Sequence, residues 1–197
     1  MRRRWLFRVS FLLSVLVLTG CGQQVSQIFE HVGSSVEAPL STAPSPASSI
    51  LQGTPFPDPI PGLAVYDLAD VLSASVEASL ETEIDAIEAR SGAEMVVYLQ
   101  VDPTATEESN TVAAGALMDL WSIGQVGIDN GFVILVSFDD DRLHGRLSTW
   151  AGAGLLGPLS QETQAHLRDD VMLPAFRAGE VEEGIVLGVT FVDHAIP

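Results

Sequence analysis

Lysine is absent from the 197-residue sequence, and cysteine occurs only once, at Cys21. A single cysteine excludes a disulfide bond within the chain, so disulfide-stabilised folds do not apply. The sequence also contains no Gly-x-Ser-x-Gly elbow, no phosphate-binding glycine-rich loop and no paired histidine motif. The common signatures of hydrolases, nucleotide-binding proteins and zinc proteins are therefore missing.

Basic residues are few and unevenly placed. Four of the nine arginines and none of the 26 acidic residues fall in the first twenty positions, so the rest of the chain has a formal charge of −21. Such a charge repels nucleic acid and anionic lipid surfaces. It favours cations or basic partners, although it is equally typical of a solubility adaptation with no partner. We expect no nucleic-acid partner.

The amino terminus has the pattern of a bacterial lipoprotein signal peptide, predicted over residues 1–20. Arginines precede an apolar stretch over residues 9–18, which is too short to cross a bilayer. The Leu-Thr-Gly sequence before Cys21 resembles a lipobox, which implies cleavage there and attachment of lipid, including palmitate, to Cys21. The alternative is an uncleaved membrane anchor. Either way, we expect the chain to lie outside the cytoplasm, in the cell envelope, held to a membrane.

Residues 21–61 are predicted to form a tether. The segment is rich in Ser, Gln and Pro, and seven of the eleven prolines fall between Pro39 and Pro61. Because proline removes amide donors and restricts its neighbour, regular structure is disfavoured here. A flexible chain of this length spans roughly 35 Å. Residues 62–197 then form a single domain of ordinary size.

Hydrophobic periodicity in this domain predicts alternating helices and strands. Ser73 is a suitable N-cap, and Thr104 with Glu107 can form a capping box. The predicted order is a helix over 73–90, a strand over 94–101, a helix from the capping box to Gly124, a strand over 132–138, a strand over 146–151, a helical region capped by Ser160 and broken by Pro174, and a helix over 181–196.

The order strand, helix, strand favours parallel pairing of the 94–101 and 132–138 strands, with a right-handed crossover. The strand over 146–151 follows a short loop and is expected to pair antiparallel. We therefore predict an α/β fold in which a small mixed sheet is covered by helices on both faces, as a three-layer sandwich.

Parallel pairing would bring several aspartates to one edge of the sheet, where open α/β sheets bind ligands. Crowded carboxylates on loops suit Ca²⁺, which accepts six to eight oxygens in irregular geometry. The alternative is that each aspartate caps a turn or a helix. The candidate metal ligands are Asp67, Asp70, Asp102, Asp139, Asp140 and Asp141.

Three other features of the domain are weaker candidates. Asp129 lies about 25 Å from the other candidate acids, at the opposite end of the 132–138 strand. Because it directly precedes Asn-Gly, we expect it to stabilise a turn. His144 lies in the acidic loop and could be a ligand, a general acid or neither. The glycine-rich segment 152–157 fits a close-packing turn better than a nucleotide loop, because Pro158 follows it.

Six short motifs follow one another along the domain. They are Val65–Ser73 (VYDLADVLS), Trp121–Gly124 (WSIG), Asp129–Gly131 (DNG), Gly152–Leu155 (GAGL), Pro174–Gly179 (PAFRAG) and Gly184–Gly188 (GIVLG). In this order and spacing the motifs resemble the TPM domain, a family named after a thylakoid lumen protein, a photosystem II protein and a nematode receptor-accessory protein. The resemblance covers Gly62 to the carboxyl terminus.

The resemblance implies a three-layer α/β domain outside the cytoplasm, with Ca²⁺ binding and acid phosphatase activity proposed for some members and assembly or accessory roles for others. Asp67, Asp129 and the pair Asp141-Arg142 match the family pattern. The sequence departs from it at Asp70, Ala153, Leu156, Val181 and in the long loop 139–145. Loss of polar groups at three of these places weakens an inherited catalytic role more than the fold.

We therefore expect a lipid-anchored envelope protein whose TPM domain binds a divalent cation and assists a membrane-protein complex. The first alternative is a metal-assisted acid phosphatase in which Asp67, Asp139 and Asp141 hold the metal and Arg142 binds the phosphate. The second is a non-catalytic structural module. The sequence leaves open whether the protein is an enzyme.

Overall fold

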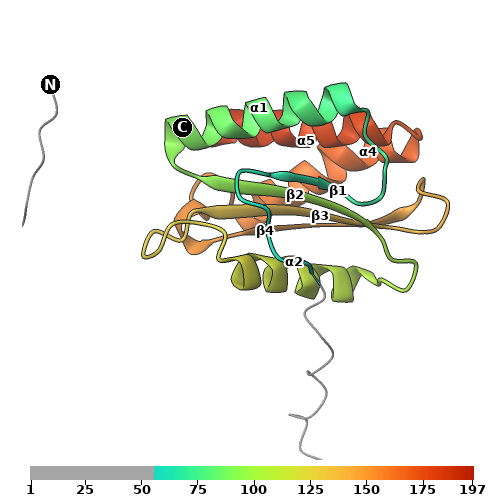
Figure 1. Ribbon diagram of the computed structural model, residues 1–197, viewed down its shortest axis with the longest axis horizontal. Helices are drawn as coiled ribbons and strands as arrows, with labels where there is room; N and C mark the ends of the chain where they lie inside the picture. The colour runs from blue at the N-terminus through green and yellow to red at the C-terminus, as the bar shows by residue number, and fades with distance from the viewer. Residues whose placement is uncertain (1–55) are drawn as a thin grey trace, which may run out of the picture. The chain divides into compact units, whose positions relative to one another are not determined.

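The computed structural model describes residues 56–197, which form a four-stranded sheet in the order β1-β2-β3-β4 (Figure 1). β1, β2 and β3 are parallel, and β4 is antiparallel to β3. The predicted mixed sheet and parallel pairing are confirmed. The strands are β1 (Val65–Asp67), β2 (Glu94–Val101), β3 (Gly131–Phe138) and β4 (Gly145–Ala151).

The predicted signal peptide, Cys21 and most of the predicted tether lie outside the described residues. The end of that tether does not: Phe56 is only 3% exposed and packs edge-on against Tyr98, with ring centroids 5.1 Å apart. The packed part of the chain thus includes residues that precede the predicted domain start at Gly62. In the part of the chain that the structure describes, no helix is long and apolar enough to cross a membrane.

Helices cover both faces of the sheet (Figure 1). α2 (Glu107–Trp121) lies on one face. The other face carries α1 (Ala74–Ser91), α5 (Val181–Ala195) and a helical run made of α3 (Gln161–His166), η2 (Leu167–Met172) and α4 (Leu173–Arg177). A short 3₁₀ turn, η1 (Ala153–Leu155), follows β4. The predicted three-layer arrangement is confirmed.

The core consists of two clusters, one on each side of the sheet. Val97 and Ile134 face α1 and α5, whereas Tyr98 and Leu135 face α2, as expected when successive strand residues point to opposite faces. All eight residues of β3 are buried. A central strand covered on both faces needs an almost continuous apolar run, and Ser137 is the one polar residue of this segment.

The start of α2 corrects one prediction. Thr106 and Ser109 form the capping box: the Ser109 N–H donates to Thr106 Oγ1 at 3.1 Å, and the Thr106 N–H donates to Ser109 Oγ at 2.8 Å. The prediction that Thr104 and Glu107 form this box is wrong. The Thr104 hydroxyl donates to Asp102 Oδ1 at 2.6 Å instead, because Thr104 belongs to the turn that follows β2.

The predicted break at Pro174 is a change of helix type. Residues 161–177 are helical throughout, and the six residues of η2 form a π-helix directly before α4, which has Pro174 in its first turn. Proline has no N–H and its ring clashes with the carbonyl four residues earlier. The wider π turn changes the hydrogen-bonding register at this point, so the chain stays helical.

Asn110 connects α2 to the sheet by a buried polar network. Its Nδ2 donates to Ser148 Oγ and to the Arg146 carbonyl, both at 3.0 Å, and Ser137 Oγ donates to its Oδ1 at 2.7 Å. Asn110 and Ser137 are each 1% exposed. Removing the amide would leave several buried polar groups without a hydrogen-bond partner.

Substitution Asn110→Ala is expected to lower the free energy of unfolding by about 1–3 kcal/mol, because the hydroxyls and carbonyl left behind lose their partner. Urea denaturation measures the change. Val112→Ala, on the exposed side of the same helix, is the control and should stay within about 0.5 kcal/mol of the parent. Equal effects of the two substitutions would contradict a structural role for the network.

Candidate functional site

The parallel pairing sends the carboxyl ends of three strands to one edge of the sheet. β2 and β3 pair in register from Glu94 with Gly131 to Val101 with Phe138. Asp102 and the segment 139–141 therefore begin at the same edge, and Asp67 ends β1 there. The predicted acidic residues share this edge, but most of them form hydrogen bonds or ion pairs with residues close to them.

Asp67 stabilises the loop that leads into α1. Its Oδ2 accepts the N–H groups of Val71 at 2.8 Å and Leu72 at 2.7 Å. Its Oδ1 is buried without any hydrogen-bond partner in the described part of the chain. A buried carboxylate oxygen without a partner is costly, so this atom has unused capacity for a donor or a cation. Asp70 is different: its side chain is 91% exposed and its φ is +54°.

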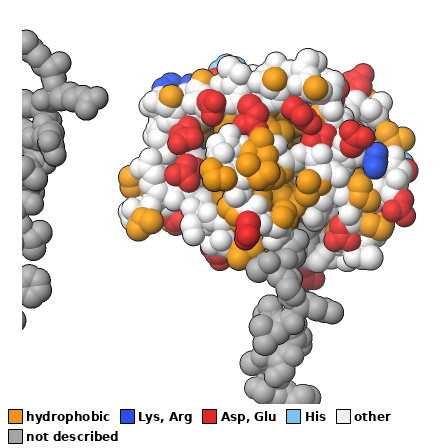
Figure 2. All heavy atoms as spheres, viewed as in Figure 1, with side chains coloured by type: hydrophobic (Ala, Val, Ile, Leu, Met, Phe, Trp, Pro, Cys, Tyr) orange, Lys and Arg blue, Asp and Glu red, His pale blue; other side chains and the backbone are white. Residues whose placement is uncertain are grey.

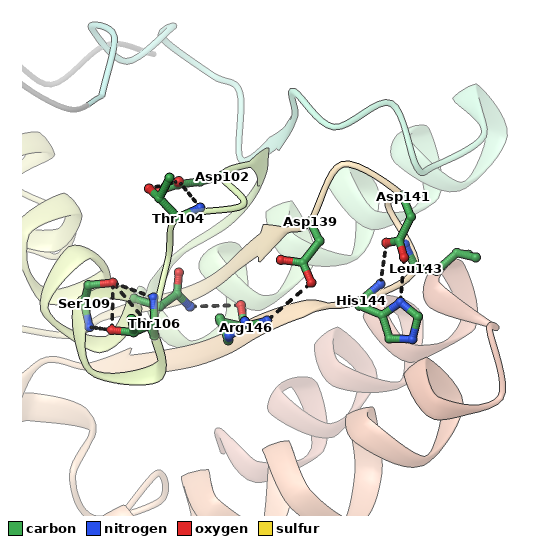
Figure 3. A network of polar contacts seen from close by, with 10 residues as sticks. Asp102, Thr104, Thr106, Ser109, Asp139, Asp141, Leu143, His144 and Arg146 are labelled. Carbon is green, nitrogen blue, oxygen red and sulfur yellow. Dashed lines mark hydrogen bonds and ion pairs between the residues drawn. The ribbon is translucent and has the colours of Figure 1, made fainter.

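Asp102 and Asp139 lie apart from each other and have different partners (Figure 3). Asp102 Oδ1 accepts the backbone N–H of Thr104 at 3.0 Å, which makes it a turn-capping residue. Asp139 Oδ2 lies 3.6 Å from Arg146 of β4. Asp140 is exposed in the loop between β3 and β4.

Asp141 and His144 form a pair at the tip of the same loop (Figure 3). Asp141 Oδ2 is 2.6 Å from His144 Nδ1, and its Oδ1 accepts the N–H groups of Leu143 and His144. The hydrogen bond with the imidazole, followed by those from the backbone, lowers the pKa of Asp141 to about 2. The same hydrogen bond raises the pKa of His144 above its ordinary value, which favours the charged imidazolium.

The acids at this edge do not form a ready-made metal centre. Within residues 56–197, no three His, Cys, Asp or Glu side chains lie close enough together to hold a metal ion. The six predicted ligands instead divide between turn caps, ion pairs and solvent. Only Asp70 and Asp141 among them line a common cavity.

That cavity, which we call the acidic hollow, has a volume of about 630 Å³ and lies between this edge and the start of α5. Arg142 lies in its wall, 3.9 Å from Asp70 Oδ2. Five carboxylates and one guanidinium give the hollow a formal charge of −4. Its charged lining residues are Asp70, Asp141, Arg142, Glu180, Glu182 and Glu183.

Sequence reasoning missed the three glutamates because it considered only loops that follow strands. The signal was present: Gly179 and Glu180 precede the apolar helix α5, and Glu182 and Glu183 lie in its first turn. Acids in the first turn of a helix also favour its dipole, so this pattern has a structural role too. Ser73, at the start of α1, donates to Glu182 Oε1 at 2.5 Å and thereby joins α1 to α5 beside the hollow.

Asp129 lies at the opposite end of β3 and stabilises a turn. Its Oδ2 accepts the Ala153 N–H at 3.0 Å, and its φ is +59°. A Cβ added to Gly152 would lie 2.2 Å from the Asp129 carbonyl oxygen, so only glycine fits there. The glycine-rich segment after β4 is thus a close-packing turn.

The protein is therefore a three-layer α/β domain with a mixed sheet. Its parallel strands end at a polar edge. The family model of the TPM domain matches residues 65–195, so the chain belongs to the TPM domain family. The predicted family is confirmed.

Two solved structures are similar. The N-terminal domain of a protein from P. gingivalis, determined in solution by NMR, has 25% sequence identity and a TM-score of 0.58, covering 68% of this chain and 82% of that one. The BA42 protein from the psychrophilic bacterium Bizionia argentinensis has 17% identity and a TM-score of 0.51, covering 66% and 84%. The second likeness concerns the fold alone. A search of curated proteins finds no match.

Proposed function

We propose that this chain is a lipid-anchored cell-envelope protein whose TPM domain binds a divalent cation, Ca²⁺, at the acidic hollow and assists a membrane-protein complex. The observation that carries the cation part is the charge of the hollow, where five carboxylates face one guanidinium. Carboxylates that line one hollow repel one another, and a bound cation relieves that repulsion.

The donor set suits a weakly bound hard cation. Glutamate and aspartate oxygens are the ligands that Ca²⁺ prefers, and its coordination tolerates irregular positions. Because no three ligating side chains are assembled in residues 56–197, loop residues would have to move and water would complete the coordination. The expected dissociation constant is therefore about 0.1–1 mM, the range of extracellular calcium modules.

The phosphatase alternative is less well supported by the charges. Asp139, one of its predicted metal ligands, lies beside Arg146 instead. Arg142, the predicted phosphate ligand, lies beside Asp70 in a hollow of net negative charge. Without a bound metal, a phosphate dianion would be repelled there, whereas a cation is attracted. These placements favour binding over hydrolysis.

The anchoring and accessory parts of the proposal have a different basis. The lipobox-like sequence at Cys21 supports attachment to a membrane, and the proline-rich tether would keep the domain near that membrane. A domain held there and carrying a strong negative charge suits a membrane-protein partner with basic extracytoplasmic segments.

Calcium is expected to raise the melting temperature of the full chain. At one hundred times its dissociation constant, a ligand that binds only the folded state adds about 2.7 kcal/mol to stability. The double variant Asp70→Asn/Glu183→Gln should lose most of this gain. The matched control is Glu108→Gln/Asp169→Asn, two exposed acids outside the hollow, and it should keep the gain. Equal loss in both variants would show general charge screening instead of a site.

Lipidation is tested by growing cells that express the chain with radiolabelled palmitate. The parent chain is expected to incorporate label and to sediment with membranes, whereas Cys21→Ser should do neither. Thr19→Ser keeps a small residue in the lipobox and should be labelled normally. A Cys21→Ser chain that still sediments with membranes would instead support an uncleaved anchor.

A further inference from the structure

A cavity of about 410 Å³ lies between α4 and the hairpin of β3 and β4, and we call it the α4 pocket. The sheet forms its floor. Val136 and Phe138 are two residues apart in β3, so both side chains point to the same face, and each is only 1% exposed. The volume is within the range of about 300–1,000 Å³ that is usual for small-ligand pockets.

The walls of the α4 pocket are apolar and accessible. Leu173, Phe176 and Arg177 lie three and four residues apart in α4, so they share one side of this helix. Leu147 of β4 belongs to the wall as well. Leu147, Leu173 and Phe176 are each partly exposed, and the volume is the space that stays empty with these side chains in place. Apolar surface is therefore open to a ligand here.

Two arginines, Arg146 and Arg177, line the same pocket. The Arg146 guanidinium lies 3.6 Å from Asp139 Oδ2, which makes an ion pair but is too long for a hydrogen bond. Arg177 is exposed and forms no ion pair with the described residues. Within residues 56–197, the arginine side chains that donate hydrogen bonds are Arg90 and Arg168. The donors of both pocket arginines are therefore available to a ligand.

The charge of the α4 pocket is opposite in sign to that of the chain. One aspartate, Asp139, and the two arginines give it a formal charge of +1. His144 lines it too, but Asp141 lies 2.6 Å from its Nδ1 and balances its charge. Figure 2 shows one face of the domain, on which acidic side chains far outnumber basic ones. A positively charged pocket in such a chain attracts anions.

Apolar walls combined with free guanidinium donors suit one class of ligand. A carboxylate presents two oxygens that match the planar donor array of an arginine. An aromatic body attached to it can pack against the leucine and phenylalanine side chains of the pocket. Inorganic phosphate could use the arginines but not the apolar walls, and a neutral apolar compound could use only the walls. An aromatic monocarboxylate uses both.

We propose that the α4 pocket binds a small aromatic monocarboxylate. Arg177 and Arg146 bind its carboxylate group, and the aromatic body lies against Phe176 and Leu173. The α4 pocket shares only Leu143 with the acidic hollow. This proposal is therefore separate from cation binding and from the accessory role, and it holds if either of those fails.

The test uses the full chain in detergent, without calcium, and naphthoate as the probe. Isothermal titration calorimetry measures binding at about 0.15 M salt, where the screening length is about 8 Å and distant charges contribute little. A titration into protein-free micelles is subtracted, because the probe also enters micelles. Saturable binding of one naphthoate per chain is expected. The absence of saturable binding would overturn the proposal.

The variant Arg177→Gln is expected to bind naphthoate about tenfold more weakly, because it loses a hydrogen bond between charged groups. The Arg177 side chain is exposed, so this variant should fold normally. The matched control is Val126→Glu, which makes the same change in net charge in the loop that leads into β3. It should stay within about twofold of the parent. Equal weakening in both variants would indicate general repulsion by an acidic chain and would contradict the assigned site.

Two other ligands and the NMR spectrum test the two halves of the pocket. Naphthalenemethanol keeps the rings without the charge and should bind about tenfold more weakly than naphthoate. Inorganic phosphate at the same concentration should not displace naphthoate, because it has no apolar body. The largest amide shifts on binding should fall in residues 145–147 and 173–177, with little change at Glu94. Equal binding of the alcohol, displacement by phosphate, or shifts centred elsewhere would each overturn the proposal.

Discussion

The parallel register of β2 and β3 is the constraint on which the rest of the structure depends. Eight consecutive pairs join two apolar strands, and this pairing decides which loops meet at each edge of the sheet. It places Asp102 and the segment 139–141 at one edge of the sheet. The close-packed turn around Asp129 lies at the other edge. A shift of the register by one residue would exchange the two faces of the strand, so that the side chains that now pack on α2 would point toward α1 and α5.

The acidic edge illustrates how a protein with few basic residues manages its negative charge. Backbone N–H groups neutralise part of the charge on Asp67 and Asp102, an imidazole pairs with Asp141, and Arg146 lies beside Asp139. Each of these contacts is local. The three glutamates at the start of α5 have no such basic partner in the described part of the chain, and the acidic hollow that they line is where we propose that a cation binds.

The sequence predicts the strands and the layer order because both follow from patterns of apolar residues. The apolar run of residues 132–138 could only be a buried strand or a buried helix, and Asn130-Gly131 before it favours the strand. The helix over 73–90 follows likewise from its apolar spacing and from Gly92, which adopts the left-handed conformation at its end. Such local and periodic signals do not require knowledge of distant contacts.

The features that escaped prediction depend on contacts between segments far apart in sequence. Asp102 accepts a hydrogen bond from Thr104, and the N-cap of α2 is Thr106 instead of Thr104. The acidic hollow needs α5 beside the β3–β4 loop, and Asn110 acquires its role only when α2 lies on β4. Phe56 was assigned to the tether, yet it is buried against Tyr98.

The central claim is that the hollow beside α5, and not the whole row of aspartates, attracts the cation. Paramagnetic broadening by Mn²⁺, an oxygen-seeking stand-in for Ca²⁺, would locate it in the NMR spectrum of the full chain. We predict the strongest loss of signal at Asp70, Asp141 and Glu183, with little change at Asp102 or Asp129. Broadening centred on Asp102 or Asp129, or spread evenly over all acidic residues, would contradict the account.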